Sequence, residues 1–132
     1  MADKVLRRDD LLFPELCYNI NGVLFEVFRQ LGGGHQERYY QRAVSAGLKA
    51  RGIKFVEQKY VPLKFNGEVV GRYYLDFLIE DVVVLELKRG KFLDARVIDQ
   101  VQQYLFSLDL QLALIACFTH NGVFTKRIIN IQ

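Results

Sequence analysis

The sequence has little cysteine, which argues against a disulfide-stabilised fold. Only two of its 132 residues are cysteines, Cys17 and Cys117, and both lie in apolar stretches. Two cysteines in a chain of this length do not build a disulfide framework, and a cysteine-based metal site is not indicated. We therefore expect both to be buried free thiols in a reducing compartment.

Long apolar runs, targeting segments and linkers are also missing. No apolar run approaches the ~18 residues that a membrane-spanning helix needs. The charged segment 1–10 lacks the apolar centre of a signal peptide. These absences predict a cytoplasmic protein without a membrane partner. Because there is no internal repeat, low-complexity tract or Pro/Gly/Ser-rich linker either, we expect residues 1–132 to form a single domain.

No strong excess of either charge is present. The formal net charge is +3, from 18 lysines and arginines against 15 aspartates and glutamates. These residues are spread along the chain rather than clustered. The balance is compatible with a polyanionic partner but does not demand one, so function has to be sought in local motifs.

Changes in hydrophobic period predict an ordered series of helices and strands. Apolar residues recur at helical spacing in the first third of the chain, and alternation with period two begins near residue 53. Asn66-Gly67 and Glu80-Asp81 mark turns. The predicted elements are helices 11–31 and 36–51, strands 53–65, 69–79 and 82–88, helix 94–108, strand 112–118 and a weakly alternating last segment, 123–131. Helix 94–108 would make a right-handed crossover between two parallel strands.

Three charged residues interrupt the apolar hairpin 73–88: Asp76, Glu86 and Lys88. A buried charge costs several kcal/mol unless it is paired or binds a metal. Asp76 and Glu86 lie equally far from Asp81, so in a tight hairpin they are cross-strand neighbours with Cβ atoms about 5 Å apart. Lys88 shares the face of Glu86 because side chains alternate along a strand, and odd-numbered neighbours point into the core.

Two facing carboxylates repel each other, and a hard divalent cation relieves that repulsion. Mg²⁺ is the natural ion, with Mn²⁺ as a substitute. Such an ion can bind a phosphate oxygen, lower the pKa of a bound water and stabilise a leaving oxygen. Lys88 can orient the attacking water and neutralise developing charge. The alternative interpretation is a salt-bridged patch on a solvated sheet face.

Together with these charges, three further motifs resemble the PD-(D/E)XK nuclease superfamily and, within it, the GxxExxY family. They occur in the expected order and cover about residues 15–129. Phe28 stands where that family commonly has histidine, but no acidic or basic position of the core motif is lost. The motifs are Gly34-His35-Gln36-Glu37-Arg38-Tyr39-Tyr40, then Gly67 and Gly71 before Tyr74-Leu75-Asp76, then Glu86-Leu87-Lys88, then Gln100-Val101-Gln102-Gln103-Tyr104-Leu105.

The resemblance implies an α/β (α+β) fold with a restriction-endonuclease-like αβββαβ core. Helices would flank a mixed central sheet, and helix 11–31 would be an N-terminal addition. The resemblance further implies a role for each motif residue: Asp76, Glu86 and the backbone carbonyl of Leu87 as metal ligands, Lys88 as the catalytic lysine, Glu37 assisting the metal or its waters, and Gln100 beside the site.

Several other residues near the motifs have two interpretations. Either Glu57 or Gln58 faces the same side as Asp76 and could line the site. Arg89 and Lys91 follow Lys88 directly and could contact a phosphate backbone, or they could form a solvated loop. The remaining candidates are expected to be structural: Tyr40 in the core, with His35 and His120 at the surface.

The leading hypothesis is a Mg²⁺-dependent nuclease, a phosphodiesterase acting on nucleic acid, with DNA as the expected substrate. One alternative is a nucleic-acid-binding or accessory protein that keeps the fold but does not cleave. Another is a structural subunit with an inert ion-pair cluster. Because a chain of this length is close to the bare core, a homodimer or a partner protein could help it to grip a duplex.

Overall fold

A computed structural model of the chain describes residues 12–91 and 93–131. The predicted elements are found in the predicted order, and the weakly alternating last segment forms a strand. The helices are α2 (Pro14–Leu31), α3 (Glu37–Ala50) and α4 (Ala95–Leu108), and the strands are β1 (Phe55–Phe65), β2 (Glu68–Ile79), β3 (Val83–Arg89), β4 (Leu112–Phe118) and β5 (Val123–Ile129). Within the described residues, no helix is long and apolar enough to cross a membrane.

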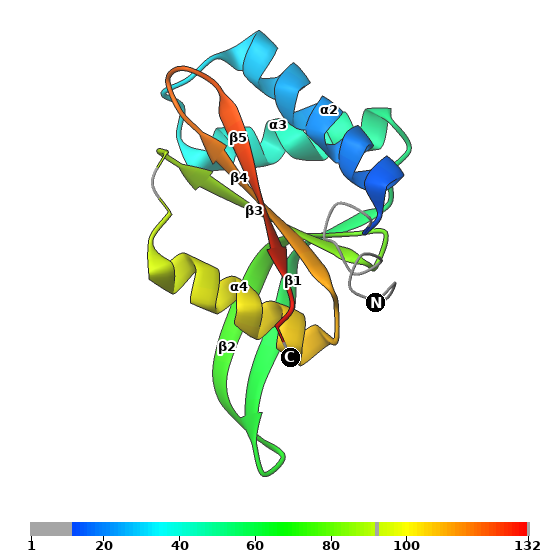
Figure 1. Cartoon of the computed structure of the whole chain (residues 1–132), viewed down its shortest axis with the longest axis vertical. Helices are drawn as coiled ribbons and strands as arrows, with labels where there is room; N and C mark the ends of the chain where they lie inside the picture. The colour runs from blue at the N-terminus through cyan, green and yellow to red at the C-terminus, as the bar shows by residue number, and fades with distance from the viewer. Residues whose placement is uncertain (1–11, 92, 132) are drawn as a thin grey trace, which may run out of the picture.

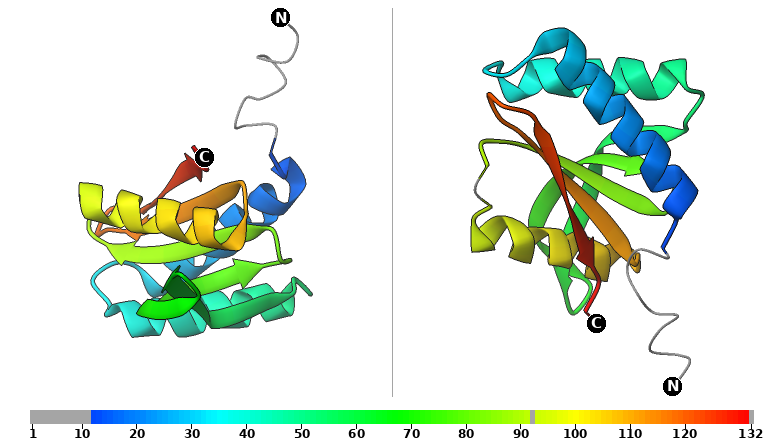
Figure 2. Two further views of the ribbon diagram at one scale, coloured as in Figure 1. Left: turned by 90° about the horizontal axis from the view of Figure 1, so that it is seen from below. Right: turned by 45° about the horizontal axis from the view of Figure 1, so that its top comes forward.

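The strands form one mixed sheet with the order β1-β2-β3-β4-β5. β3 and β4 run parallel and are joined by α4, whereas the other neighbouring strands are antiparallel. The helices cover both faces, with α2 and α3 on one side and α4 on the other (Figure 1, Figure 2). This arrangement confirms the predicted αβββαβ core, preceded by an additional helix, α2.

Covering both faces of the sheet creates two hydrophobic cores. The first lies between the sheet and helices α2 and α3, and the second lies between the sheet and α4. β3 contributes Leu85 and Leu87 to the first core and Val84 to the second, which agrees with the predicted alternation. Strands covered on both faces are apolar throughout. Glu86 is therefore exceptional: it is the one charged residue in the described part of the chain that is fully buried.

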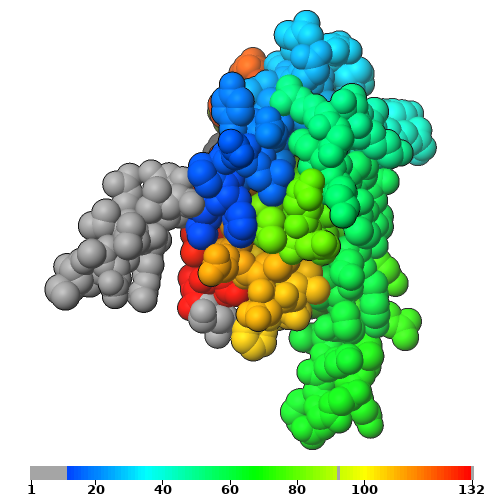
Figure 3. All heavy atoms as spheres, turned by 90° about the vertical axis from the view of Figure 1, so that its right-hand side faces the viewer, coloured from blue at the N-terminus to red at the C-terminus, as the bar shows by residue number. Residues whose placement is uncertain are grey.

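The β1–β2 hairpin projects from the body of the molecule (Figure 1, Figure 3). β1 is an edge strand, and its register shifts between Leu63 and Lys64, close to Pro62, as expected for proline in a strand. On β2, Phe77 packs in the first core while Leu75 packs in the second. Two residues of the same parity on β2 therefore face different cores, so the regular alternation is interrupted between them. The change occurs where Gln58 adopts a left-handed conformation with φ 49°.

The α2–α3 loop is held against the end of the β4–β5 hairpin. Tyr40 is buried, as predicted, and its ring stacks on Phe118 at 4.1 Å between centroids. Its hydroxyl donates to the carbonyl of Gly32 at 2.7 Å. A Cβ placed on Gly33 would lie 2.5 Å from both the Cα of His120 and the carbonyl oxygen of Thr119. Only a residue without a side chain permits this approach.

We expect Gly33→Ala to lower the free energy of unfolding by about 1–3 kcal/mol, because the added methyl group meets backbone atoms that cannot rotate away. Urea denaturation followed by circular dichroism measures the loss. Gly122→Ala is the matched control, because its Cβ would meet only Phe124, at an ordinary 3.8 Å. Equal stability of the two variants would contradict the close contact between the loops.

Candidate active site

The hydrogen-bond ladder between β2 and β3 ends beside Asp76 and Glu86. The paired residues are Ile79 with Val83, Leu78 with Val84 and Phe77 with Leu85, so the same register continued by one pair sets Asp76 opposite Glu86. There the carboxylates replace backbone acceptors. Glu86 Oε2 accepts the N–H of Asp76 at 2.7 Å, and Asp76 Oδ2 accepts the N–H of Leu87 at 2.8 Å. Each acidic side chain is thus bound to the backbone of the other strand.

Burial and mutual repulsion perturb both carboxyl groups. Burial raises the pKa of Glu86 to about 8, helped by the negative charge of Asp76 and opposed by the Asp76 N–H and by Lys88. Burial also raises the pKa of Asp76 above its usual range, against the opposing effects of the Leu87 N–H, Lys88 and Gln58. The metal-free pair therefore holds a proton near neutral pH, as closely interacting carboxyl groups do.

Lys88 lies beside the two carboxylates, as the alternation along β3 predicts. It is half-buried, and its positive charge lowers the pKa of both acids. α4 supplies the neighbouring wall, because burial, followed by the charges of Glu86 and Asp76, raises the pKa of the Tyr104 hydroxyl. Tyr73 packs edge-on against Tyr104 at 6.0 Å between ring centroids. The site is thus bounded by aromatic side chains on its α4 side.

Of the two supporting residues implied by the resemblance, Glu37 acts on the site through its charge, and Gln100 lies on α4. Glu37 is the first residue of α3 and is exposed, yet its negative charge contributes to the raised pKa of Glu86. Gln100 is half-buried on α4 and lines a pocket of about 400 Å³ together with Tyr73. No hydrogen bond between described residues joins Gln100 to the carboxylates, and the lining of this pocket includes neither of them, so its place beside the site stays a prediction.

The structure also brings two glutamines to Asp76: Gln58, one of the two residues that the sequence left open, and Gln41, which the sequence did not single out. Gln58 Nε2 donates to Asp76 Oδ1 at 3.4 Å, and Gln41 Nε2 donates to the carbonyl oxygen of Asp76 at 3.5 Å. Gln58 does so from a left-handed conformation that costs a non-glycine residue roughly 1 kcal/mol or more. Counting outward from the Asn66-Gly67 turn sets Glu57 opposite Asp76, and the register shift between Leu63 and Lys64 brings Gln58 there instead.

The donor set fits a hard divalent cation. No group of three or more His, Cys, Asp or Glu side chains that could hold a metal occurs in the described ranges, and this site offers the two carboxylates of Asp76 and Glu86. Hydrogen bonds between described residues use only Oε2 of Glu86 and leave Oε1 for another partner. Ions such as Mg²⁺ suit one or two carboxylates because they retain several waters.

Two solved structures have a similar fold. The crystal structure of SSO0001 is 14% identical, with a TM-score of 0.55, over 70% of this chain and 49% of that one. The alkaline exonuclease LHK-Exo from Laribacter hongkongensis is 15% identical, with a TM-score of 0.51, over 70% of this chain and 54% of that one. At this identity the likeness concerns the fold alone, and this chain spans only about half of either protein.

Comparison of sequences identifies the family. None of the curated proteins matches the chain. A model of the PD-(D/E)XK nuclease superfamily matches residues 14–129, which include both carboxylates, the lysine and all the elements around them. The chain therefore belongs to the PD-(D/E)XK nuclease superfamily.

Proposed function

We propose that the protein is a Mg²⁺-dependent phosphodiesterase that hydrolyses nucleic acid, with DNA as the expected substrate and Mn²⁺ as a substitute ion. The observation that carries the proposal is the facing pair of Asp76 and Glu86 with Lys88 on the same side. Membership of a nuclease superfamily whose members generally use divalent metals supports it. The likeness of the fold to an alkaline exonuclease points the same way.

The roles of the residues follow from their positions. A bound divalent ion would polarise the phosphate and lower the pKa of a water. Asp76 and Glu86, with the Leu87 carbonyl, are proposed to hold that ion, and its charge would replace the proton that the metal-free pair holds. Lys88 would donate to the attacking water and offset the charge that develops on the phosphate. Gln58 would keep Asp76 oriented through its 3.4 Å hydrogen bond.

The supporting residues, the subfamily and the assembly also belong to this proposal. Glu37, whose charge already acts on Glu86, would bind water near the ion, and Gln100 would approach the substrate from α4. The four ordered motifs favour the GxxExxY family. We further propose that residues 1–132 act as one domain in the cytoplasm, as the buried free thiols suggest, and that a second copy or a partner protein helps to hold a duplex.

The proposal predicts that Asp76→Ala and Lys88→Ala each lose at least about 100-fold in cleavage rate, the usual contribution of a group acting on the transition state. Purified protein would be incubated with single- and double-stranded DNA and RNA in Mg²⁺ or Mn²⁺. Lys49→Ala is the control, because it removes an exposed lysine near the C-terminal end of α3. Undiminished activity in both site variants would refute the assignment. Binding without cleavage in any metal would support the non-cleaving alternative.

The raised pKa of Glu86 predicts a defined dependence of stability on pH. Between its ordinary pKa of 4.5 and about 8, the folded metal-free protein holds more protons than the unfolded chain. The free energy of unfolding therefore falls as pH rises through this window, by up to about 1.36 kcal/mol per pH unit and proton. Glu86→Gln keeps a side-chain acceptor for the Asp76 N–H, so this contribution should disappear in that variant.

Thermal unfolding in EDTA between pH 5 and pH 8.5 measures the difference between the wild type and Glu86→Gln. If the stability of the two proteins changes with pH in the same way, the raised pKa of the buried Glu86 carboxyl group is contradicted. Addition of Mg²⁺ or Mn²⁺ at pH 8 should then stabilise the wild type by about 2.7 kcal/mol when the ion exceeds its Kd a hundredfold. Glu86→Gln should gain much less, because it lacks one charged ligand.

A further inference from the structure

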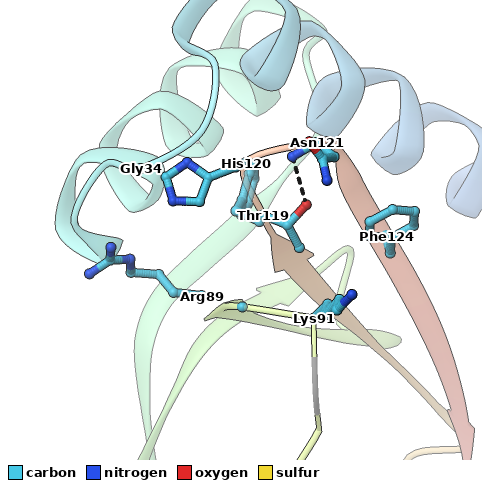
Figure 4. A pocket seen from close by; sticks show the side chains of 9 residues that line it. Gly34, Arg89, Lys91, Thr119, His120, Asn121 and Phe124 are labelled. Carbon is cyan, nitrogen blue, oxygen red and sulfur yellow. Dashed lines mark hydrogen bonds between the residues drawn. The ribbon is translucent and has the colours of Figure 1, made fainter.

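A second concave site lies at the carboxyl ends of the parallel strands β3 and β4 (Figure 4). This terminal pocket has a volume of about 620 Å³. It is lined by residues of the α2–α3 loop, the loop after β3, the end of β4, the β4–β5 turn and the start of β5. In open sheets with parallel strands, ligands bind in the crevice beyond the carboxyl ends of the strands. The volume also falls within the range of pockets that hold small organic ligands.

The walls of the terminal pocket are fixed by contacts already present in the protein. Thr119 Oγ1 accepts the N–H groups of Asn121 and Gly122, both at 3.1 Å, which closes the β4–β5 turn. The N–H of Gly90 donates to the carbonyl of Phe118 at 2.9 Å and ties the loop after β3 to β4. On the other side, Gly33 lies against the backbone of His120. The pocket therefore exists before any ligand arrives.

The lining of the pocket combines positive charge with an exposed aromatic ring. Arg89 and Lys91 contribute two cations, His120 and Asn121 add polar groups, and none of the nine lining residues is acidic. Phe124, 56% exposed, lies on the same side as Lys91 and Asn121, and the side chain of Arg89 extends toward the opposite side (Figure 4). Cationic side chains bind phosphates, and exposed aromatic rings stack on unpaired bases. Phosphate and base occur together in one ligand class, a nucleotide.

The terminal pocket lies next to the paired carboxylates along the same strand. Arg89 directly follows Lys88, and alternation sets their side chains on opposite faces of β3. A nucleic-acid strand that crosses the end of β3 would pass both residues in turn.

We propose that the terminal pocket binds an unpaired nucleotide of the substrate strand beside the point of cleavage. Arg89 and Lys91 contact its phosphates, and Phe124 stacks on its base. The inference rests on the proposed function in taking nucleic acid as the substrate. It adds a selectivity, because a base held against Phe124 cannot also be paired in a duplex. The protein thus favours single-stranded segments or frayed ends over blunt duplex.

Binding of a short fluorescein-labelled single-stranded oligodeoxynucleotide, followed by anisotropy in EDTA, separates this site from catalysis. Lys91→Ala should reduce the slope of log K against log salt by about 0.7, the share of one phosphate contact on a single strand. Phe124→Ala should weaken binding about 5- to 140-fold and leave that slope unchanged, because stacking involves no counterion release. A blunt duplex of the same sequence should bind more weakly and respond little to Phe124→Ala.

Matched controls remove the same side chains elsewhere. Phe106→Ala removes an aromatic ring on α4 that is 61% exposed, and Lys49→Ala removes an exposed lysine on α3. Neither residue lines the terminal pocket. Both control variants should bind as the wild type does. The inference is overturned if Phe124→Ala and Lys91→Ala bind as their controls do. It is also overturned if Phe124→Ala weakens binding of duplex and of single strand equally.

The same measurements distinguish failure of this inference from failure of the proposed function. Suppose that cleavage requires a metal, Asp76 and Lys88, but the pocket variants bind as the wild type does. This result overturns the inference about the pocket and leaves the proposed function standing. If the pocket variants weaken binding but no metal supports cleavage, the inference about the pocket is supported and the proposed nuclease activity is overturned. If the protein binds neither single-stranded DNA nor single-stranded RNA, the inference about the pocket is overturned. If it also cleaves neither, the proposed function is overturned as well.

Discussion

The exchange of hydrogen bonds between Asp76 and Glu86 is the interaction on which the rest of the site depends. Where the ladder between β2 and β3 stops, backbone N–H groups would otherwise be left unpaired in a buried place, at a cost of about 1–3 kcal/mol each. The two carboxylates accept the N–H groups of Asp76 and Leu87. Acidic side chains thus satisfy the backbone where the sheet opens, and the opening gives the site its room.

The layering of the fold explains why these acids are unusual. A sheet with helices on both faces leaves no solvated face for β3, so Glu86 is buried among apolar neighbours and its pKa rises. Taken alone, such a residue destabilises the protein. A buried acidic residue is tolerated where a charged partner compensates for the cost of its burial. Residues with pKa values perturbed in this way are concentrated at active sites. Lys88 provides part of that compensation within the chain.

Much of the fold and the centre of the site were predictable because they follow from local rules. Period, turn residues and the count of positions from Asp81 predicted the elements and set Asp76 opposite Glu86. The sequence did not decide between Glu57 and Gln58, because the left-handed conformation of Gln58 interrupts the alternation from which its side would be inferred. The β4–β5 turn was not predictable as a pocket wall, since its position depends on Gly33 contacting a segment almost ninety residues further along the chain.

The change of core along β2 has a mechanical consequence. The strand is packed against the first core at Phe77 and against the second core at Leu75, and Asp76 lies between them. A change of packing in either core would therefore shift the backbone at Asp76. The separation of the two carboxylates would then vary with the alignment of the helices on opposite faces. The two cores together thus hold Asp76 in place opposite Glu86.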